Sequence, residues 1–262
     1  VVAMARLAPE DKYCGIPNAS DVTDDRTDLD LECDDTPEAP ELERRARDME
    51  AAVLAIPEVQ QASHSGASWS TSARWVAASN GFAAHKRSGM TSLAAVAIAG
   101  RDGAMERDYE SRSERRLARM PTPHAIGRIA GERAVERLSP RKLDSRTSAV
   151  IFERRLSNRL LGAFIGAITG PGIARGVSFL KDRLGKSGLA PGVSVIDDPL
   201  RPGGFGSRSF DGEGRAVKRT AIVDDGVLTQ WLLNGPSARQ LGLAPNGFAS
   251  SGFGDPPGVT TS

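Results

Sequence analysis

The chain has 262 residues, enough for two domains of ordinary size, each with its own hydrophobic core. Its 34 Lys and Arg residues nearly balance 33 Asp and Glu residues, so the net charge provides no overall attraction for a polyanion. We therefore expect no direct binding of nucleic acid. The longest apolar run, residues 160–168, is well short of the roughly 20 residues that span a bilayer. With Cys14 and Cys33 interpreted as reduced thiols, we expect a soluble, cytoplasmic protein without a membrane partner.

The N-terminal part of the chain is predicted to be mostly loop. Residues 1–7 resemble the last turns of a helix, and residues 9–40 are Asp-rich and poor in apolar side chains, so we interpret them as a linker whose bulk does not pack. Over residues 41–56, apolar residues recur at helical spacing until Pro57. This pattern predicts an amphipathic helix that lies on a sheet.

The next stretch is predicted to supply that sheet as an antiparallel meander of short strands. The predicted strands cover residues 59–70, 73–79, 81–88, 91–99 and 103–113. Turn signals separate several of them, namely Asn80-Gly81, Ser88-Gly89 and Arg101-Asp102-Gly103.

Three aromatic residues, Trp69, Trp75 and Phe82, lie in these strands. Such rings can stack on nucleic-acid bases, but no basic groove is evident around them, so we interpret them as core or cross-strand packing.

The pattern of residues 123–138 predicts a second helix, and we expect the domain boundary near residues 140–146.

The stretch of residues 150–188 predicts the core of the last domain. Residues 149–152 are interpreted as a short buried strand that leads into a helix. The apolar residues on one face of this helix are Leu156, Leu160, Leu161, Phe164, Ile165 and Ile168. Gly162, Gly166 and Gly170 follow at intervals of four, and each helical glycine costs about 1 kcal/mol relative to alanine, so we expect close packing against their backbone.

Further elements complete an α+β fold, in which a middle domain of antiparallel strands and covering helices precedes the first part of a mixed C-terminal domain. They are a helix over residues 177–184, a strand over 193–197, a hairpin of 217–223 with 227–233, and a short helix over 236–241. The hairpin prediction relies on the turn signal Asp224-Asp225-Gly226.

Charged clusters in this half are candidates for binding. Asp197, Asp198, Asp211 and Glu213 can in principle hold a hard cation or exchange protons, but their position at strand ends and turns favours capping of backbone amides. Arginines at the start of the long helix are candidate contacts for a peptide carboxylate or a partner's acidic surface, although a solvated face is the simpler interpretation. These arginines are Arg154, Arg155 and Arg159.

Several short motifs, in one order, resemble a known family. They include Val150-Ile151-Phe152 with the glycine-rich helix, Ser178-Phe179-Leu180, Phe210-Asp211-x-Glu213-Gly214, residues 225–233, and Ser237-Ala238-Arg239. This set resembles the PmbA (TldE) branch of the TldD/PmbA metalloproteases over residues 149–243, with weaker similarity over 3–140. The resemblance implies an internal fragment with the end of an N-terminal domain at 1–19, a middle domain at 20–140 and a truncated C-terminal domain at 141–262.

The TldD branch of this family carries a zinc motif, His-Glu-x-x-x-His, on the equivalent helix. Placing the two branches together by Leu160-Leu161 puts Gly162, Ala163 and Ala167 where the histidine, glutamate and histidine stand. None of these three side chains has a lone pair for a metal, so we predict no catalytic residue, metal ligand or cofactor in this chain. The histidines of the chain lie in separate predicted elements and are His64, His85 and His124.

The resemblance implies a cytosolic heterodimeric metalloprotease complex in which a TldD-like partner carries zinc and cleaves unfolded peptides, while this chain is a non-catalytic PmbA/TldE-like subunit. The family is associated with microcin precursor maturation, antitoxin degradation and modulation of DNA gyrase. Two alternatives stay open. One is an independent metallopeptidase whose ligands lie outside these residues, and the other is a non-proteolytic binding protein that acts on gyrase or another partner.

Overall fold

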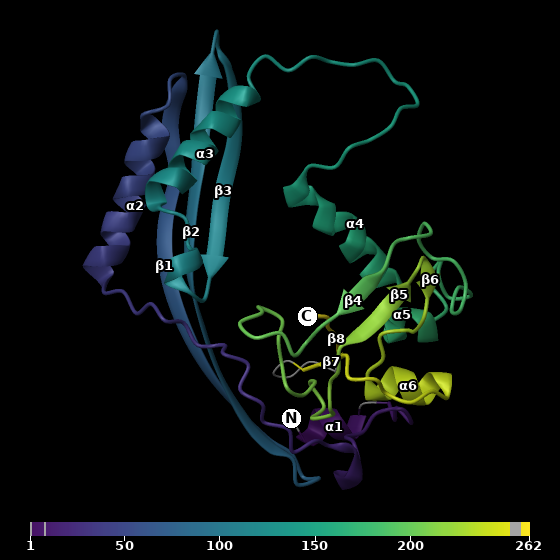
Figure 1. Cartoon of the computed structure of the whole chain (residues 1–262). Helices are drawn as coiled ribbons and strands as arrows, with labels where there is room; N and C mark the ends of the chain where they lie inside the picture. The colour runs from purple at the N-terminus through teal and green to yellow at the C-terminus, as the bar shows by residue number, and fades with distance from the viewer. Residues whose placement is uncertain (1, 8, 252–257) are drawn as a thin grey trace. The chain divides into compact units, whose positions relative to one another are not determined.

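The structure is a computed structural model that describes residues 2–7, 9–251 and 258–262 (Figure 1). The chain divides into two compact units. The C-terminal unit comprises Val1–Asp30, Trp75–Ala84 and Val150–Ser262, and the sheet unit comprises Leu31–Arg74 and His85–Ala149. Helices and antiparallel strands build the fold, which confirms the predicted α+β class.

Three long strands make the sheet of the sheet unit: β1 (Val59–Ala77), β2 (Ala83–Arg101) and β3 (Ala104–Glu114). They follow one another in the order β1-β2-β3, and β2 pairs antiparallel with β3, so the predicted meander is confirmed. A short 3₁₀ helix, η2 (Leu117–Arg119), follows β3.

The predicted division into five short strands is wrong, because β1 and β2 each run through an expected break. Gly89 lies inside β2, and its amide donates a hydrogen bond to the carbonyl oxygen of Leu31 at 3.0 Å. A Cβ atom at Gly89 would lie 3.1 Å from Cys33 Cβ and from the carbonyl oxygen of Ser70. This glycine therefore marks a close approach of neighbouring chain segments and not a turn.

Two helices, α2 (Ala39–Leu54) and α3 (Pro123–Glu136), pack on one face of this sheet, as predicted (Figure 1). They bury apolar side chains against alternate residues of β2, because successive side chains of a strand point to opposite faces. The main members of this core are Met49, Val53, Leu93, Ala95, Ala97, Ile126 and Ala130. The helices approach closely at Gly127, where a Cβ atom would lie 2.2 Å from the carbonyl oxygen of Met49.

Residues 9–40 are mostly loop, as predicted, with α1 (Val2–Leu7) before them and a short 3₁₀ helix, η1 (Ala19–Asp21), within them. The expectation that its bulk does not pack is confirmed, because most of these residues are exposed, but a few of them are buried. Leu29 and Leu31 are buried, and Asp35 forms a buried ion pair with Arg45 of α2, with 2.6 Å between Oδ2 and Nη1. The acidic stretch therefore supplies core residues as well as solvated carboxylates.

The C-terminal unit contains α4 (Arg154–Ala167), α5 (Gly170–Ala174), α6 (Gly235–Leu241) and two small sheets. One sheet has the order β4-β5-β6, with β4 (Val195–Asp197), β5 (Thr220–Asp224) and β6 (Val227–Leu228) paired antiparallel. The other pairs β7 (Ala249–Ser250) with β8 (Gly258–Val259). The predicted strand, hairpin turn and short helix are confirmed, but the second strand of the hairpin ends at Leu228 and not at Leu233. The core that these elements surround includes Phe164, Ile168, Ile222, Leu228, Leu232 and Phe248.

The helix predicted over residues 177–184 is wrong. Helical structure ends at Ala174, and Gly176 takes a positive φ of 72°. The hydroxyl of Ser178 then donates to the carbonyl oxygen of Ala167 at 2.5 Å and accepts from the amide of Leu180 at 3.0 Å. A serine side chain thus satisfies backbone groups that a helix would have paired.

The predicted buried strand at residues 149–152 is also wrong, because these residues lack regular secondary structure and are exposed. In α4 itself only Phe164 is buried, so the predicted core begins there, while Leu156, Leu160 and Leu161 are exposed. Of the three glycines expected to allow close packing, Gly170 does so. A Cβ atom at Gly170 would lie 2.2 Å from Ser237 Oγ, whereas at Gly162 and Gly166 it would meet no atom of the described residues within 4 Å.

The aromatic residues have different environments. Phe82 is buried, and its ring meets that of Phe210 edge-on at 5.2 Å between centroids, with the Arg26 guanidinium within 5.6 Å of both rings. The core interpretation is confirmed for Phe82. Trp75 is exposed and is therefore not a core residue, so cross-strand packing stays a prediction for it, and Trp69 is half-buried. None of the helices in the described ranges combines the length and apolar character needed to cross a bilayer.

Candidate functional site

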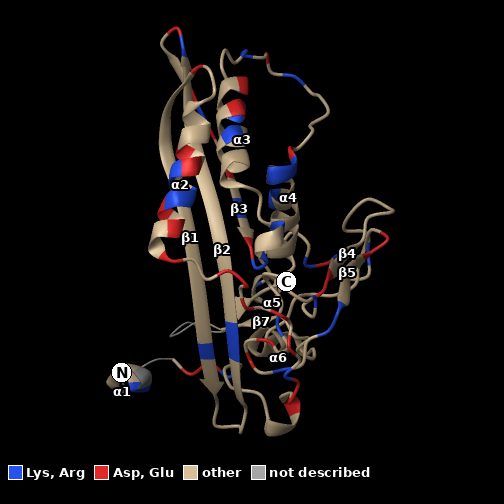
Figure 2. Ribbon diagram, turned by 60° about the vertical axis from the view of Figure 1, so that its left-hand side comes forward, with Lys and Arg blue, Asp and Glu red and all other residues tan. Residues whose placement is uncertain are grey.

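The candidate arginines lie on the first two turns of α4, where Figure 2 shows basic residues in blue. Residues four apart share one face of a helix, so Arg155 and Arg159 lie in one row with Ala163 and Ala167. Arg154 and Arg159 are exposed, and Arg155 is half-buried. The row therefore passes from guanidinium groups at the start of the helix to methyl groups at its end.

Arg155 forms a bidentate pair with the residue before the helix. Its Nε is 2.6 Å from Oε1 of Glu153, and its Nη2 is 3.1 Å from Oε2. Because this pair neutralises part of the local charge, Arg154 and Arg159 are the better candidates for binding a carboxylate from another molecule.

The side chains of α4 do not fit the zinc that the TldD branch is expected to carry on its equivalent helix. A catalytic zinc takes three nitrogen, oxygen or sulfur ligands from the protein and keeps one position for water or substrate. Gly162, Ala163 and Ala167 offer no side-chain donor atom. The face around Gly162 has room for a side chain, but it lacks the chemistry that a metal requires.

Other possible metal ligands are dispersed. His64 lies on β1, His85 on β2 and His124 on α3. Within residues 2–7, 9–251 and 258–262, no three or more His, Cys, Asp or Glu side chains are grouped so that they could hold a metal ion. Cys14 and Cys33 are both free thiols.

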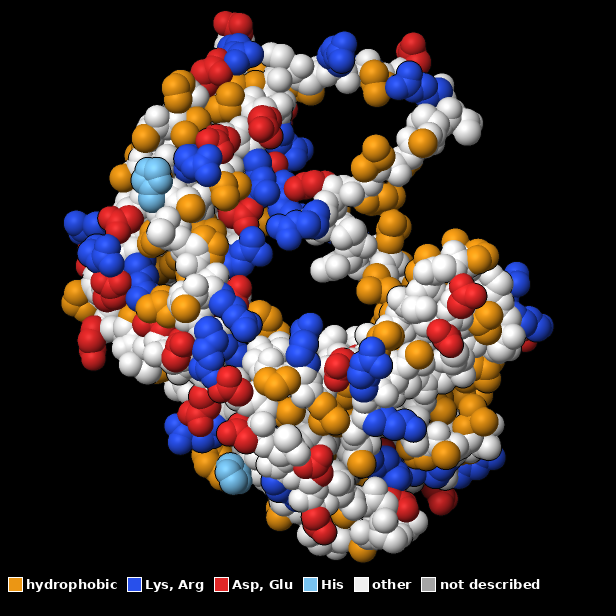
Figure 3. All heavy atoms as spheres, in the orientation of Figure 1, with side chains coloured by type: hydrophobic (Ala, Val, Ile, Leu, Met, Phe, Trp, Pro, Cys, Tyr) orange, Lys and Arg blue, Asp and Glu red, His pale blue; other side chains and the backbone are white. Residues whose placement is uncertain are grey.

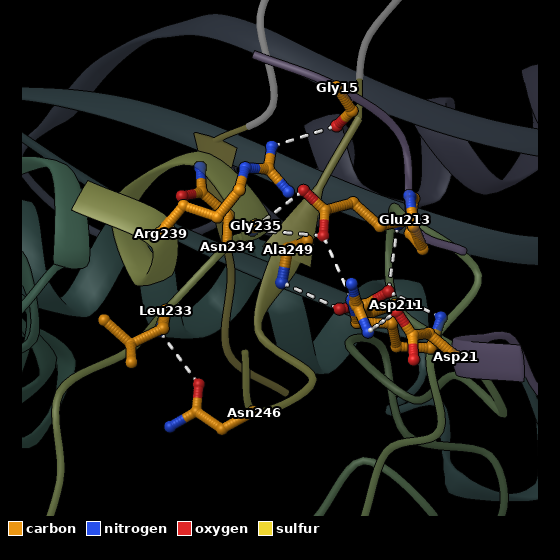
Figure 4. A network of polar contacts seen from close by, with 12 residues as sticks. Gly15, Asp21, Asp211, Glu213, Leu233, Asn234, Gly235, Arg239, Asn246 and Ala249 are labelled. Atoms are coloured by element: carbon orange, nitrogen blue, oxygen red, sulfur yellow. Dashed lines mark hydrogen bonds and ion pairs between the residues drawn. The ribbon is translucent and has the colours of Figure 1, made fainter. Parts of the chain in front are cut away.

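The acidic motif at residues 210–214 binds backbone amides (Figure 4). Oδ1 of the buried Asp211 accepts hydrogen bonds from the amides of Glu213 and Arg215, both at 2.9 Å, and Oδ2 accepts from the amide of Ala249 at 3.2 Å. Burial raises the pKa of the Asp211 carboxyl, and these amide donors oppose that rise. Asp211 thus joins the turn to β7, as the structural interpretation of this motif predicts.

Glu213 links the same turn to the start of α6 (Figure 4). Its carboxylate accepts from the amide of Gly235 at 2.9 Å and lies 3.4 Å from Nε of Arg215.

The side chain of Asn234 caps α6 by accepting a hydrogen bond from the amide of Ser237 at 3.0 Å. Arg239 on α6 donates to the carbonyl oxygens of Tyr13 and Gly15 at 2.7 and 3.1 Å. These family-like motifs form a structural network.

Asp197 and Asp198 also make structural contacts. Asp197 is buried and accepts from the amide and hydroxyl of Ser262 at 2.5 and 2.8 Å, while its other oxygen lies 3.7 Å from Nη2 of Arg208. Asp198 pairs with Arg219 at 3.6 Å. Burial lowers the pKa of Arg208, and the nearby charges of Asp197 and Asp211 oppose this. The carboxylates of this region therefore already have protein partners.

Sequence reasoning missed two members of these networks. An Asn followed by Gly-Pro is a helix-start signature that identifies Asn234 as the cap of α6. No comparable local pattern identifies Arg208, because its partners Asp197, Gly247 and Thr260 are distant in the sequence.

Solved structures define the fold class. A Bacteroides thetaiotaomicron protein described as a candidate modulator of DNA gyrase matches 94% of this chain and 57% of its own, with a TM-score of 0.85 and 23% identity. A Thermotoga maritima protein with a similar description matches 95% of this chain and 56% of its own, with a TM-score of 0.78 and 22% identity. TldE from Thermococcus kodakarensis matches 99% and 58%, with a TM-score of 0.71 and 14% identity. The fold is thus of the TldD/TldE type.

Sequence comparisons identify the family. The family model of the PmbA/TldA metallopeptidase central domain matches residues 29–138, and that of the C-terminal domain matches residues 145–262. Metalloprotease PmbA of Escherichia coli O157:H7 is 40% identical over 158 residues, which are 60% of this chain and 35% of that protein. The PmbA homolog of Haemophilus influenzae is 29% identical over 251 residues, 95% of this chain and 55% of that protein. The chain belongs to the PmbA/TldD metallopeptidase family.

The matched region is only a part of the relatives. It spans about a third of the Escherichia coli protein and about half of the Haemophilus influenzae protein. The predicted domain boundaries, 1–19, 20–140 and 141–262, stay a prediction.

Proposed function

We propose that this chain is a PmbA/TldE-like, non-catalytic subunit of a TldD/TldE-type metalloprotease that processes unfolded peptides in the cytoplasm. The observation that carries the proposal is the chemistry of α4, where glycine and alanine occupy the positions that we align with the zinc motif of the TldD branch. In this account the TldD-like partner supplies the zinc and cleaves the peptide. This chain needs no cofactor of its own.

The role left to this chain is to shape the place where peptides bind. Gly162 and Ala163 leave exposed positions of α4 without bulky side chains, and Arg159 lies one turn before Ala163 in the same row. A small-residue face with cations at one end suits an extended peptide that carries a carboxylate. The arginines are therefore proposed as contacts for a peptide or for the partner subunit. A charge-assisted hydrogen bond of this kind contributes about 1.5–3 kcal/mol.

Reconstitution with separately purified subunits tests the proposal. The full-length chain and a TldD-like subunit from the same genome are mixed, and turnover of an unfolded peptide is measured for each alone and for both together. We expect zinc and turnover to follow the TldD-like subunit, and turnover to rise when this chain is added. Stoichiometric zinc and peptide cleavage by this chain alone would instead support the independent metallopeptidase.

A charge reversal tests the arginine contact within the complex. Arg159→Glu is expected to raise the KM for the peptide about tenfold, which corresponds to about 1.4 kcal/mol, without changing the zinc content. Arg175→Glu, at an exposed arginine just after α5, is the matched control and is expected to leave KM unchanged. Equal KM values for both variants would reject the role of Arg159 and leave the subunit assignment intact.

Removal of this chain distinguishes the remaining alternative. If the TldD-like subunit cleaves peptides equally well without it, a non-proteolytic binding protein is favoured, in line with the descriptions of the Bacteroides and Thermotoga structures.

A further inference from the structure

The loop that follows α5 presents basic side chains beside an exposed aromatic ring. We call residues 177–186 the basic loop. Overlapping turns fold it, in which the amides of Lys181, Arg183 and Lys186 donate hydrogen bonds to the carbonyl oxygens three residues before them at 3.3, 2.9 and 2.9 Å. Because the first and fourth residues of a turn lie within about 7 Å of each other, the side chains of the loop gather in a small area.

Both ends of the basic loop are attached to the core of the C-terminal unit. Near its start, the hydroxyl of Ser178 donates to a carbonyl oxygen at the end of α4, and Leu180 lies in the hydrophobic core. At its end, the amide of Gly185 donates to the carbonyl oxygen of Leu228 in β6 at 2.8 Å, and the amide of Leu228 donates to the carbonyl oxygen of Lys186 at 3.0 Å. The exposed side chains of the loop therefore extend from a backbone that is fixed at both ends.

Phe179 is the exposed member of the Ser178-Phe179-Leu180 motif. It is 80% exposed, whereas Ser178 and Leu180 are 8% and 7% exposed. The contacts of its two neighbours explain their part in the fold, but they give no reason for an aromatic ring between them. Aromatic residues are enriched at protein interfaces, where a rigid ring buries a large apolar area at a low cost in conformational entropy. Phe179 therefore has the chemistry of an anchor for another molecule.

The basic side chains around Phe179 are not neutralised within the described part of the chain. The basic loop carries three basic residues against one acidic residue, which leaves a net charge of +2. These residues are Lys181, Arg183, Lys186 and Asp182. All four are exposed, and none of them takes part in an ion pair within residues 2–7, 9–251 and 258–262. Figure 3 shows basic side chains, in blue, at the right-hand edge of the C-terminal unit, next to the place of β6 in Figure 1.

We propose that the basic loop is a docking site for an acidic peptide segment of another protein. Phe179 packs against an apolar side chain of that segment, while Lys181 and Arg183 bind its carboxylates. The site is separate from α4, and it does not depend on the non-catalytic role of the chain.

The number and kind of side chains in the basic loop favour this partner over other polyanions. Attachment to anionic lipid commonly uses about four to eight basic residues. Single-stranded nucleic acid is bound in a positively charged groove where successive bases stack on several aromatic side chains. Three basic residues and one exposed ring instead match a segment of a few residues that combines carboxylates with an apolar side chain.

Fluorescence anisotropy tests the proposal on the full-length chain. The probe is a labelled peptide of about ten residues in which glutamate and leucine alternate. We expect saturable binding, and we expect Lys181→Glu to weaken it at least about fivefold. Lys218→Glu, at an exposed lysine of the same unit, is the matched control and is expected to change the affinity less than about twofold. Equal weakening by both variants, or no binding at about 1 mM peptide, would overturn the proposal.

Substitution of the ring provides a second test. Phe179→Ala is expected to weaken binding of the peptide at least about fivefold, whereas Phe179→Tyr keeps the ring and is expected to retain the affinity. Because the site is exposed, both variants are expected to keep the thermal midpoint of the chain within about 2 °C. An unchanged affinity of Phe179→Ala contradicts the proposal. Tighter binding of phosphatidylserine vesicles or of a single-stranded oligonucleotide than of the peptide also contradicts it.

Discussion

The carboxylate of Glu213 accepts a hydrogen bond at 2.9 Å from the backbone amide of Gly235, the first residue of α6. The two residues are 22 positions apart, and Glu213 belongs to the 210–214 motif, while α6 begins immediately before the Ser237-Ala238-Arg239 motif. The contact satisfies an amide that the first turn of a helix leaves unpaired. These motifs, which support the family resemblance, therefore have a structural role in this chain.

Substitution of Glu213 tests that role. Glu213→Ala removes the acceptor for the Gly235 amide and a neighbour of Arg215, and it is expected to reduce the free energy of unfolding by about 1–3 kcal/mol. Urea denaturation measures the loss. Asp198→Ala, which breaks only the 3.6 Å surface pair with Arg219, is expected to cost less than about 1 kcal/mol. Equal effects of the two substitutions would contradict the structural role.

Alanine substitutions at the glycines of α4 and α5 are expected to have opposite effects on the stability of the protein. Gly170→Ala places a methyl group against the buried Ser237 and Leu233, so we expect a loss of about 1–3 kcal/mol. Gly162→Ala and Gly166→Ala meet no described atom within 4 Å and are each expected to stabilise the protein by up to about 1 kcal/mol. Thermal denaturation of the three variants checks this, and destabilisation by Gly162→Ala would show that its helix face is packed.

The buried pair of Asp35 with Arg45 ties the acidic loop to α2. Asp35→Ala removes the buried partner of the Arg45 guanidinium and leaves it beside Glu41, so we expect a loss of about 3 kcal/mol. Glu43→Ala breaks the exposed pair with Arg47 on the same helix and is expected to change stability by less than about 1 kcal/mol. A small effect of Asp35→Ala in denaturant unfolding would mean that the loop does not pack as described.

The carboxyl of Glu41 is expected to make the stability of the sheet unit depend on pH in the acid range. Hydrogen bonds from Arg44 and then Arg45 lower the pKa of its carboxyl from 4.5 to about 2. A carboxyl whose pKa is lower in the folded state stabilises the fold above its unfolded pKa, and this contribution is lost as pH falls from 4.5 toward 2. Glu41→Gln is therefore expected to flatten the pH dependence of unfolding within that window. An NMR titration that places the Glu41 pKa near 4.5 would contradict the contact.

Local sequence pattern predicted α2, α3 and α6 well, because each has apolar spacing and a proline near its start. The same local reasoning failed where a distant contact decides the conformation. Gly89 resembles a turn residue, but it is held inside β2 by contacts with Leu31, Cys33 and Ser70. Ser178 sits in a helix-like pattern, but its hydroxyl binds the Ala167 carbonyl oxygen.

The chemistry of the side chains at the candidate site could be predicted from the sequence, but their exposure could not. The absence of donor atoms at Gly162, Ala163 and Ala167 can be read directly from the sequence, and so can the positive charge of Arg154 and Arg159. The exposure of Leu156 and Leu160 was not predictable, because a helical apolar row predicts burial without specifying which segment provides the cover.

The zinc content of this chain tests the account most directly. The full-length chain is purified alone, incubated with zinc, freed of weakly bound metal, and analysed by elemental mass spectrometry. Because metal affinity requires ligand side chains, we predict no more than about one zinc per ten chains, with peptide cleavage appearing only when a TldD-like subunit is added. One tightly bound zinc per chain, with peptide cleavage in the absence of that subunit, would contradict the non-catalytic role.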